Sequence, residues 1–161
     1  MPDTAETSRH GHIQVVLGAE IEPAYGRGRG GPGGWWIVSN VEVRLGDGCV
    51  VRPDLAGWNR ERLQELPETA PVDVVPDWVC EIMSRATERR DRMERAALYL
   101  SAGVRHYRLV SERYGFIEVL ERTEAPRWAV AGGWGTGDKP RIPPFTELEL
   151  DLDAVFGTAS A

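Results

Sequence analysis

The feature that most constrains this fold is an apolar strand that is followed by a helix and then by a second strand. Residues 78–83 read WVCEIM and are apolar on both alternating faces, with Glu81 as the exception. A strand of this kind is typical of the centre of a sheet that is covered on both sides. The next segment has apolar residues at helical spacing up to Ser101 and stops at Gly103, and residues 106–110 form another strand. This order predicts a βαβ unit with two parallel strands and a right-handed crossover.

Two segments before this unit predict an antiparallel hairpin. Residues 35–45 and 49–58 are rich in β-branched and aromatic side chains, and the sequence Gly-Asp-Gly between them is typical of a tight turn. Residues 116–121 and 127–131 predict two more strands in a meander. Strands on both sides of a βαβ unit indicate an α/β fold.

The length of 161 residues is enough for one compact domain and short for two. The polar residues 1–10 are predicted to form a disordered tail, residues 11–156 the folded domain, and residues 157–161 a second tail. From His12 onward the apolar spacing predicts a short amphipathic helix that ends at Pro23, with a strand as the alternative because several of its residues are β-branched.

Composition excludes several classes of protein. The chain has no run of 18 apolar residues, so we expect no membrane-spanning helix, and its N-terminus lacks the pattern of a secretory signal. Cys49 and Cys80 form neither a disulfide framework nor a CxxC metal motif, which indicates reduced thiols and a cytoplasmic protein. The net charge of -6 argues against wrapping nucleic acid over the whole surface but leaves room for a local basic patch.

Three acidic residues fall on adjacent predicted strands. Glu42 and Asp54 lie in the two hairpin strands, and Glu81 lies in the central strand. Carboxylates that are brought close together repel one another, and a divalent cation between them relieves the repulsion. Oxygen ligands suit Mg²⁺ or Mn²⁺ rather than zinc, and such an ion activates water and stabilises charge on a phosphodiester oxygen. The three acids therefore make a candidate site for metal-dependent hydrolysis.

Each acid also has a purely structural interpretation. Glu81 can pair with an arginine of the following helix, Asp54 follows a proline as turn residues often do, and Glu42 alternates with valines as on the wet face of a strand. An ionised carboxylate in a strand that is apolar on both faces is costly unless it is compensated, which favours the functional interpretation of Glu81. Periodicity alone does not show that the three converge.

Several segments together resemble a bacterial family whose members are described as "putative restriction endonuclease" domains, within the PD-(D/E)XK nuclease superfamily. The similarity runs from about residue 11 to about residue 156. Its most specific part is the E-x-x-S end of the central strand, followed by a T-x-x-x-D-R helix and the sequence GVRHYRLV, whereas the PD dipeptide is common. The matching segments in this chain are GGPGGWWI, VRPDLAGW and PDWVCEIMS.

The resemblance implies a restriction-endonuclease-like core, in which a central mixed sheet is flanked by helices, and metal-dependent cleavage of phosphodiester bonds. Asp54 matches the acid of the first half-motif and Glu81 the acid of the second, with the backbone carbonyl of Ile82 as a further metal ligand. Glu42 resembles an additional acid from the preceding strand. The implied cofactor is Mg²⁺, with Mn²⁺ as an alternative, and the implied partner is DNA. Small nuclease domains often act as homodimers, so we expect a homodimer.

The motif lysine is replaced in this chain. Two residues after the second acid stands Met83, and the matching position on the following helix is Arg95, while the only lysine, Lys139, lies far away in the sequence. Arginine keeps the charge but cannot act as a base. Asn40 also stands where related proteins have a glutamate. Two hypotheses follow, a DNA endonuclease and an inactive nuclease-fold module that binds nucleic acid or protein, with an enzyme acting on another small substrate as a weaker third.

Overall fold

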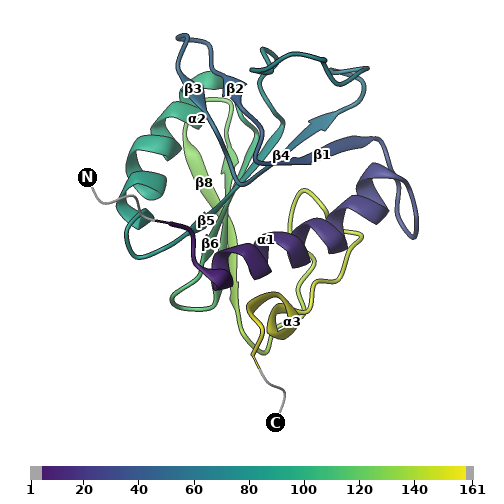
Figure 1. Cartoon of the computed structure of the whole chain (residues 1–161), viewed down its shortest axis with the longest axis vertical. Coiled ribbons are helices and arrows are strands. Elements are labelled where there is room, and N and C mark those ends of the chain that lie inside the picture. Colours follow the sequence, from purple (N-terminus) through teal and green to yellow (C-terminus); the bar gives the residue numbers. More distant parts are fainter. Residues whose placement is uncertain (1–4, 159–161) are drawn as a thin grey trace.

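A six-stranded sheet forms the centre of the computed structural model, which describes residues 5–158 (Figure 1). The strands run in the order β1-β4-β5-β6-β7-β8, and the remaining two, β2 and β3, form a separate ribbon. The β5 and β6 strands pair in parallel and all other neighbours pair antiparallel, so the predicted mixed sheet is confirmed. The bounds are β1 (Trp35–Ser39), β4 (Leu55–Asn59), β5 (Trp78–Met83), β6 (His106–Ser111), β7 (Phe116–Arg122) and β8 (Trp128–Gly135).

Helices cover both faces of this sheet, as Figure 1 shows, with α1 (Ser8–Ile21) and α3 (Leu152–Phe156) on one face and α2 (Ala96–Ala102) on the other. The helix α1 is followed directly by a π-helical turn, η1 (Glu22–Gly26), and α2 is preceded by another, η2 (Arg90–Arg95). All six residues of β5 are buried because a layer of side chains lies on each of its faces. The two-sided apolar pattern of this strand therefore predicted its central position correctly.

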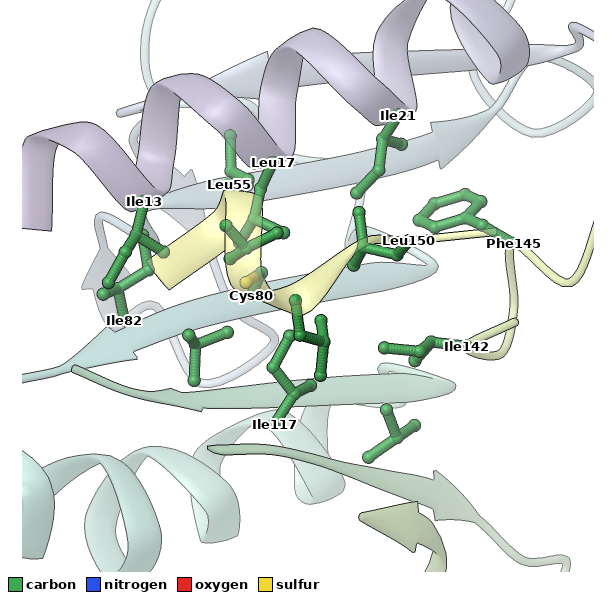
Figure 2. Close-up of a cluster of buried hydrophobic side chains, with 14 of the residues drawn as sticks. Ile13, Leu17, Ile21, Leu55, Cys80, Ile82, Ile117, Ile142, Phe145 and Leu150 are labelled. Carbon is green, nitrogen blue, oxygen red and sulfur yellow. The ribbon is translucent and has the colours of Figure 1, made fainter. Parts of the chain in front are cut away.

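The α1 helix packs on the sheet through one row of side chains. Ile13, Leu17 and Ile21 repeat every four residues, are fully buried, and point toward Leu55 and Cys80 of the sheet (Figure 2). Burial of each such side chain contributes about 1.5–3 kcal/mol. This contact holds the start of α1 close to the end of the β4–β5 pairing, at Leu55 and Cys80.

The N-terminal helix begins earlier than the sequence predicted, at Ser8 instead of near His12. The side chain of Thr7 caps it by accepting a hydrogen bond from the backbone N–H of His10 at 3.1 Å. At the other end, Thr158 still bonds to α3 through Asp153. The rest of the two predicted tails, residues 1–4 and 159–161, lies outside the described residues.

The predicted hairpin is present but interrupted. The β1 strand pairs with β4, while β2 (Val43–Arg44) pairs with β3 (Val50–Val51) in the separate ribbon. The break falls at Asn40, whose φ of 52° turns the chain, and asparagine tolerates this left-handed conformation better than most residues. Glu42 was expected inside the first hairpin strand, and instead it lies in the irregular segment between β1 and β2.

Candidate functional site

Asp54 and Glu81 lie side by side where β4 separates from β5. The backbone pairing between β4 and β5 ends at Leu55 and Cys80. Beyond this pair, backbone N–H groups donate to side-chain carboxylates instead of to the carbonyls of the neighbouring strand. The carboxylate of Asp54 accepts a hydrogen bond from the backbone N–H of Ile82 at 2.7 Å. The carboxylate of Glu81 accepts one from the backbone N–H of Asp54 at 3.1 Å. Each acid thus fixes the backbone of the other strand, and the two side chains are held together.

Glu81 is an acid in an environment that disfavours its charge. Its exposed fraction is 4%. Burial, followed by the charges of Asp54 and Asp91, raises the pKa of Glu81 to about 8, although hydrogen bonds from the Asp54 backbone and the Tyr99 hydroxyl oppose the shift. The hydroxyl of Tyr99 on α2 donates to the second carboxylate oxygen of Glu81 at 3.0 Å. A buried acid next to another acid is a group that a bound cation stabilises.

His10 is a site residue that the sequence analysis missed. It lies in the first turn of α1 with 5% of its surface exposed, and its Nε2 is 3.1 Å from Oδ1 of Asp54. This hydrogen bond with Asp54 raises the pKa of His10. The signal was available in the sequence, because Thr7 is a good N-cap and His10 falls on the helix face of Ile13 and Leu17. The polar composition of residues 1–10 instead favoured the prediction of a disordered tail.

A cavity of about 980 Å³ opens above these acids. Asp54, Ile82, His10 and Glu6 line it, whereas Glu81 lies behind Asp54 and is not among the lining residues. Arginines from four segments of the chain also line this cavity, namely Arg9, Arg85, Arg90 and Arg113. An opening that is lined by both carboxylates and guanidinium groups suits a phosphate-bearing ligand that is held beside a cation.

Two residues expected in the site lie elsewhere in the described structure. The side chain of Glu42 is exposed and does not line the cavity, and its backbone carbonyl accepts a hydrogen bond from Val72 at 2.9 Å. Arg95 is half-buried near Tyr99 and is also not a lining residue, while Arg90, one turn earlier, is. The two arginines are the first and last residues of η2, and the wider winding of this π-helical turn differs from the regular helix that the spacing predicted. The structure thus brings Asp54, Glu81 and Ile82 together, with Arg90 as the nearby arginine.

The family model described as "Uma2: putative restriction endonuclease" matches residues 2–154 of this chain. The chain belongs to the Uma2 family. Its structure is similar to a crystal structure titled as a putative nuclease belonging to DUF820 from Anabaena variabilis, with 17% sequence identity, a TM-score of 0.72, and coverage of 98% of this chain and 85% of the other. None of the curated proteins matches it.

Membership in the Uma2 family confirms the resemblance described from the sequence and supports a nuclease-like function. The structural likeness independently confirms the fold. Within residues 5–158, none of the helices combines the length and the apolar character that crossing a membrane requires.

Proposed function

We propose that this Uma2 protein is a metal-dependent endonuclease that hydrolyses phosphodiester bonds of DNA. The observation that carries the proposal is the pair of acids, Asp54 just before β4 and Glu81 in β5, which hydrogen bonds hold together beside a cavity lined by arginines. The donors fit Mg²⁺ or Mn²⁺, because carboxylates and the carbonyl of Ile82 are hard oxygen ligands. The raised pKa of buried Glu81 supports this fit, since the folded chain by itself disfavours the carboxylate charge.

Each residue has a definite task in this proposal. Asp54, Glu81 and the Ile82 carbonyl hold the ion, which supplies an activated water and stabilises charge on the phosphate when it is bound. His10 lies against Asp54, with its Nε2 3.1 Å from Oδ1, and so fixes the position of that carboxylate. The guanidinium of Arg90 binds an oxygen of the scissile phosphate, and Arg9 and Arg85 bind neighbouring phosphates of the strand. Arginine cannot remove a proton from water, so no general base is assigned to it.

A DNA cleavage assay tests the proposal. Supercoiled plasmid is incubated with the full chain and Mg²⁺ or Mn²⁺, and nicked product is measured for the wild type, Asp54→Asn and Glu42→Ala. We expect the wild type to nick the plasmid and Asp54→Asn to lower the rate on the order of 1,000-fold, because an amide is a poor ligand for a hard cation. Glu42→Ala is the matched control and should keep its rate, since Glu42 does not line the cavity.

Equal background cleavage by all three proteins would end this proposal. The inactive nuclease-fold module would then be the better description, and the observation in its favour is that Arg95, at the motif lysine position, is not among the lining residues. The domain boundaries, the homodimer and the cytoplasmic location that we expected from the sequence stay predictions.

The two arginines at the start of the second helical segment are expected to differ in their effect on cleavage. Arg90→Ala should lower the rate on the order of 100-fold, because Arg90 lines the cavity and a charged donor to a phosphate is removed. Arg95→Ala should change it by less than about threefold, since Arg95 does not line the cavity and, unlike Glu81, has no hydrogen bond or ion pair with the described acids of the site. Initial rates on the same plasmid measure both effects, and circular dichroism checks the fold of Arg90→Ala, which also loses an ion pair with Asp91 at 3.2 Å. The reverse ranking would restore the assignment of Arg95 to the site.

A further inference from the structure

A second set of ligand atoms lies on the cavity side of Asp54. Glu6, His10 and Asp54 each present one oxygen or nitrogen, and these atoms all lie within 4.8 Å of one another. All three residues line the cavity, unlike Glu81. Glu112, at the end of β6, adds another negative charge toward His10. The side of Asp54 that faces the cavity therefore has a mixed nitrogen and oxygen donor set that the sequence motif does not include.

The imidazole of His10 is buried, yet one of its nitrogens has no hydrogen-bond partner. Nδ1 is 3.4 Å from Oε2 of Glu6 but lacks hydrogen-bonding geometry to any described group. Buried polar atoms are rarely left without a partner in proteins, and those that are indicate a bound water, an ion or a functional role. Nε2 lies 3.1 Å from Oδ1 of Asp54, and two neighbouring ligands of one octahedral ion with bonds near 2.1 Å have a separation of about 3 Å. With the ring proton on Nδ1, which faces Glu6, the lone pair of Nε2 is available to an ion, as is usual for histidines that bind metals. Little rearrangement is then needed for Nε2 and Asp54 to bind the same ion.

We propose that His10 is a direct ligand of the same divalent ion as Asp54, with Glu6 beside it, and that this nitrogen makes the site select Mn²⁺ over Mg²⁺. The inference deepens the proposed function and rests on its metal site. Mg²⁺ prefers oxygen ligands and gives up water reluctantly, whereas Mn²⁺ accepts imidazole more readily. The acidic neighbours Glu6 and Glu112 add charge that attracts either ion, so the selectivity comes from the histidine nitrogen.

Binding measurements on the full chain test this inference without any use of activity. Isothermal titration with MnCl₂ and with MgCl₂ is made on the wild type, His10→Ala and His12→Ala. We expect the wild type to bind Mn²⁺ at least about 10-fold more tightly than Mg²⁺. His10→Ala should lose about 10- to 100-fold in Mn²⁺ affinity and less than about threefold in Mg²⁺ affinity. His12→Ala is the matched control, because His12 lies on the same helix but is exposed and does not line the cavity. Its ring makes a hydrogen bond with the carbonyl of Ala154.

A spectroscopic measurement on the wild type covers the case in which His10→Ala does not fold. Electron spin echo measurements of bound Mn²⁺ should show modulation by an imidazole nitrogen, and the modulation should persist in His12→Ala. Bound Mn²⁺ without nitrogen modulation, or equal affinities for Mn²⁺ in wild type and folded His10→Ala, would overturn the inference.

The outcomes separate this inference from the proposed function. Cleavage that depends on Asp54, together with Mn²⁺ that lacks a nitrogen ligand, overturns the role of His10 and leaves the nuclease proposal standing. Mn²⁺ bound through nitrogen in a protein that does not cleave DNA supports the role of His10 and overturns the nuclease proposal. A wild type that binds neither ion overturns both.

Discussion

Glu81→Gln is expected to stop DNA cleavage and, at the same time, to stabilise the protein. The loss of cleavage should be on the order of 1,000-fold, because the amide removes a charged metal ligand. The gain in stability follows from the position of Glu81, which is almost completely buried beside Asp54 and near Asp91. A neutral side chain of the same shape removes the cost of burying that charge.

The amide also fits the two hydrogen bonds that the carboxylate makes. The oxygen of glutamine can still accept from the backbone N–H of Asp54, and its NH₂ can donate to the hydroxyl oxygen of Tyr99. We therefore expect the free energy of unfolding at pH 8 to rise on the order of 2 kcal/mol. Acids kept at a functional site at a cost in stability are the usual trade between stability and activity.

The stability that Glu81→Gln gains over the wild type should increase with pH. The pKa of Glu81 is about 8 in the folded protein and 4.5 in its unperturbed state. Between these values the folded protein holds a proton that the unfolded chain has released, so the stability of the wild type falls as the pH rises from about 4.5 to about 8. Glu81→Gln lacks this proton, and its advantage over the wild type should grow through the same window.

Urea unfolding at pH 5 and pH 8, in the presence of a metal chelator, measures this difference. The chelator is needed because a bound cation would stabilise the wild type selectively. Glu94→Gln is the matched control, since Glu94 is exposed on η2 and should show no such gain. A Glu81→Gln protein that is less stable than the wild type at pH 8 would contradict the prediction.

Arg108→Met is expected to stabilise the protein by about 1–4 kcal/mol. Arg108 lies in β6 with 1% of its surface exposed, and its Nε and Nη1 have no hydrogen-bond partner in the described structure. Burial lowers its pKa to about 10. Its guanidinium carbon lies 5.3 Å from the ring centroid of Trp78 and 5.8 Å from that of Phe145. Such contacts return about 0.5–2 kcal/mol, and the hydrogen bond that Nη2 donates to the carbonyl of Ile142 is long, at 3.5 Å. Together they return less than the cost of burying a charge without an ion pair.

Methionine suits this position because it is unbranched, flexible and able to fill the volume of the arginine stem. Thermal and urea unfolding of Arg108→Met and of the exposed-site control Arg105→Met measure the effect. The control should stay within about 0.5 kcal/mol of the wild type. A loss of more than about 1 kcal/mol in Arg108→Met would mean that the buried guanidinium has a partner that compensates its charge.

The fold was predictable largely because the residues of β5 by themselves indicate where this strand lies in the sheet. A strand that is apolar on both faces must lie inside a sheet, and a helix between two such strands makes them parallel. The same strand contains Glu81, whose position among buried residues indicated a special role. The proximity of Asp54 and Glu81 followed from the pairing of β4 with β5.

The rest of the site depended on local backbone geometry that periodicity does not encode. The left-handed conformation at Asn40 breaks the first hairpin strand, and Glu42 therefore lies away from the cavity. Within η2, whose π-helical winding departs from that of a regular helix, Arg90 lines the cavity, whereas Arg95, the position that the family resemblance implied, does not. His10 was missed because a polar segment of ten residues suggested a tail.

The sequence by itself determined the order of the elements, the central strand and the acids on two neighbouring strands, because alternation and apolar content follow directly from which faces must be buried. Only the tertiary structure decided which side chains share the cavity with those acids. Packing of α1 through Ile13, Leu17 and Ile21 places His10 against Asp54, and this contact joins residues 44 positions apart in the chain. Contacts of that range arise from how the layers dock, which no local pattern of residues specifies.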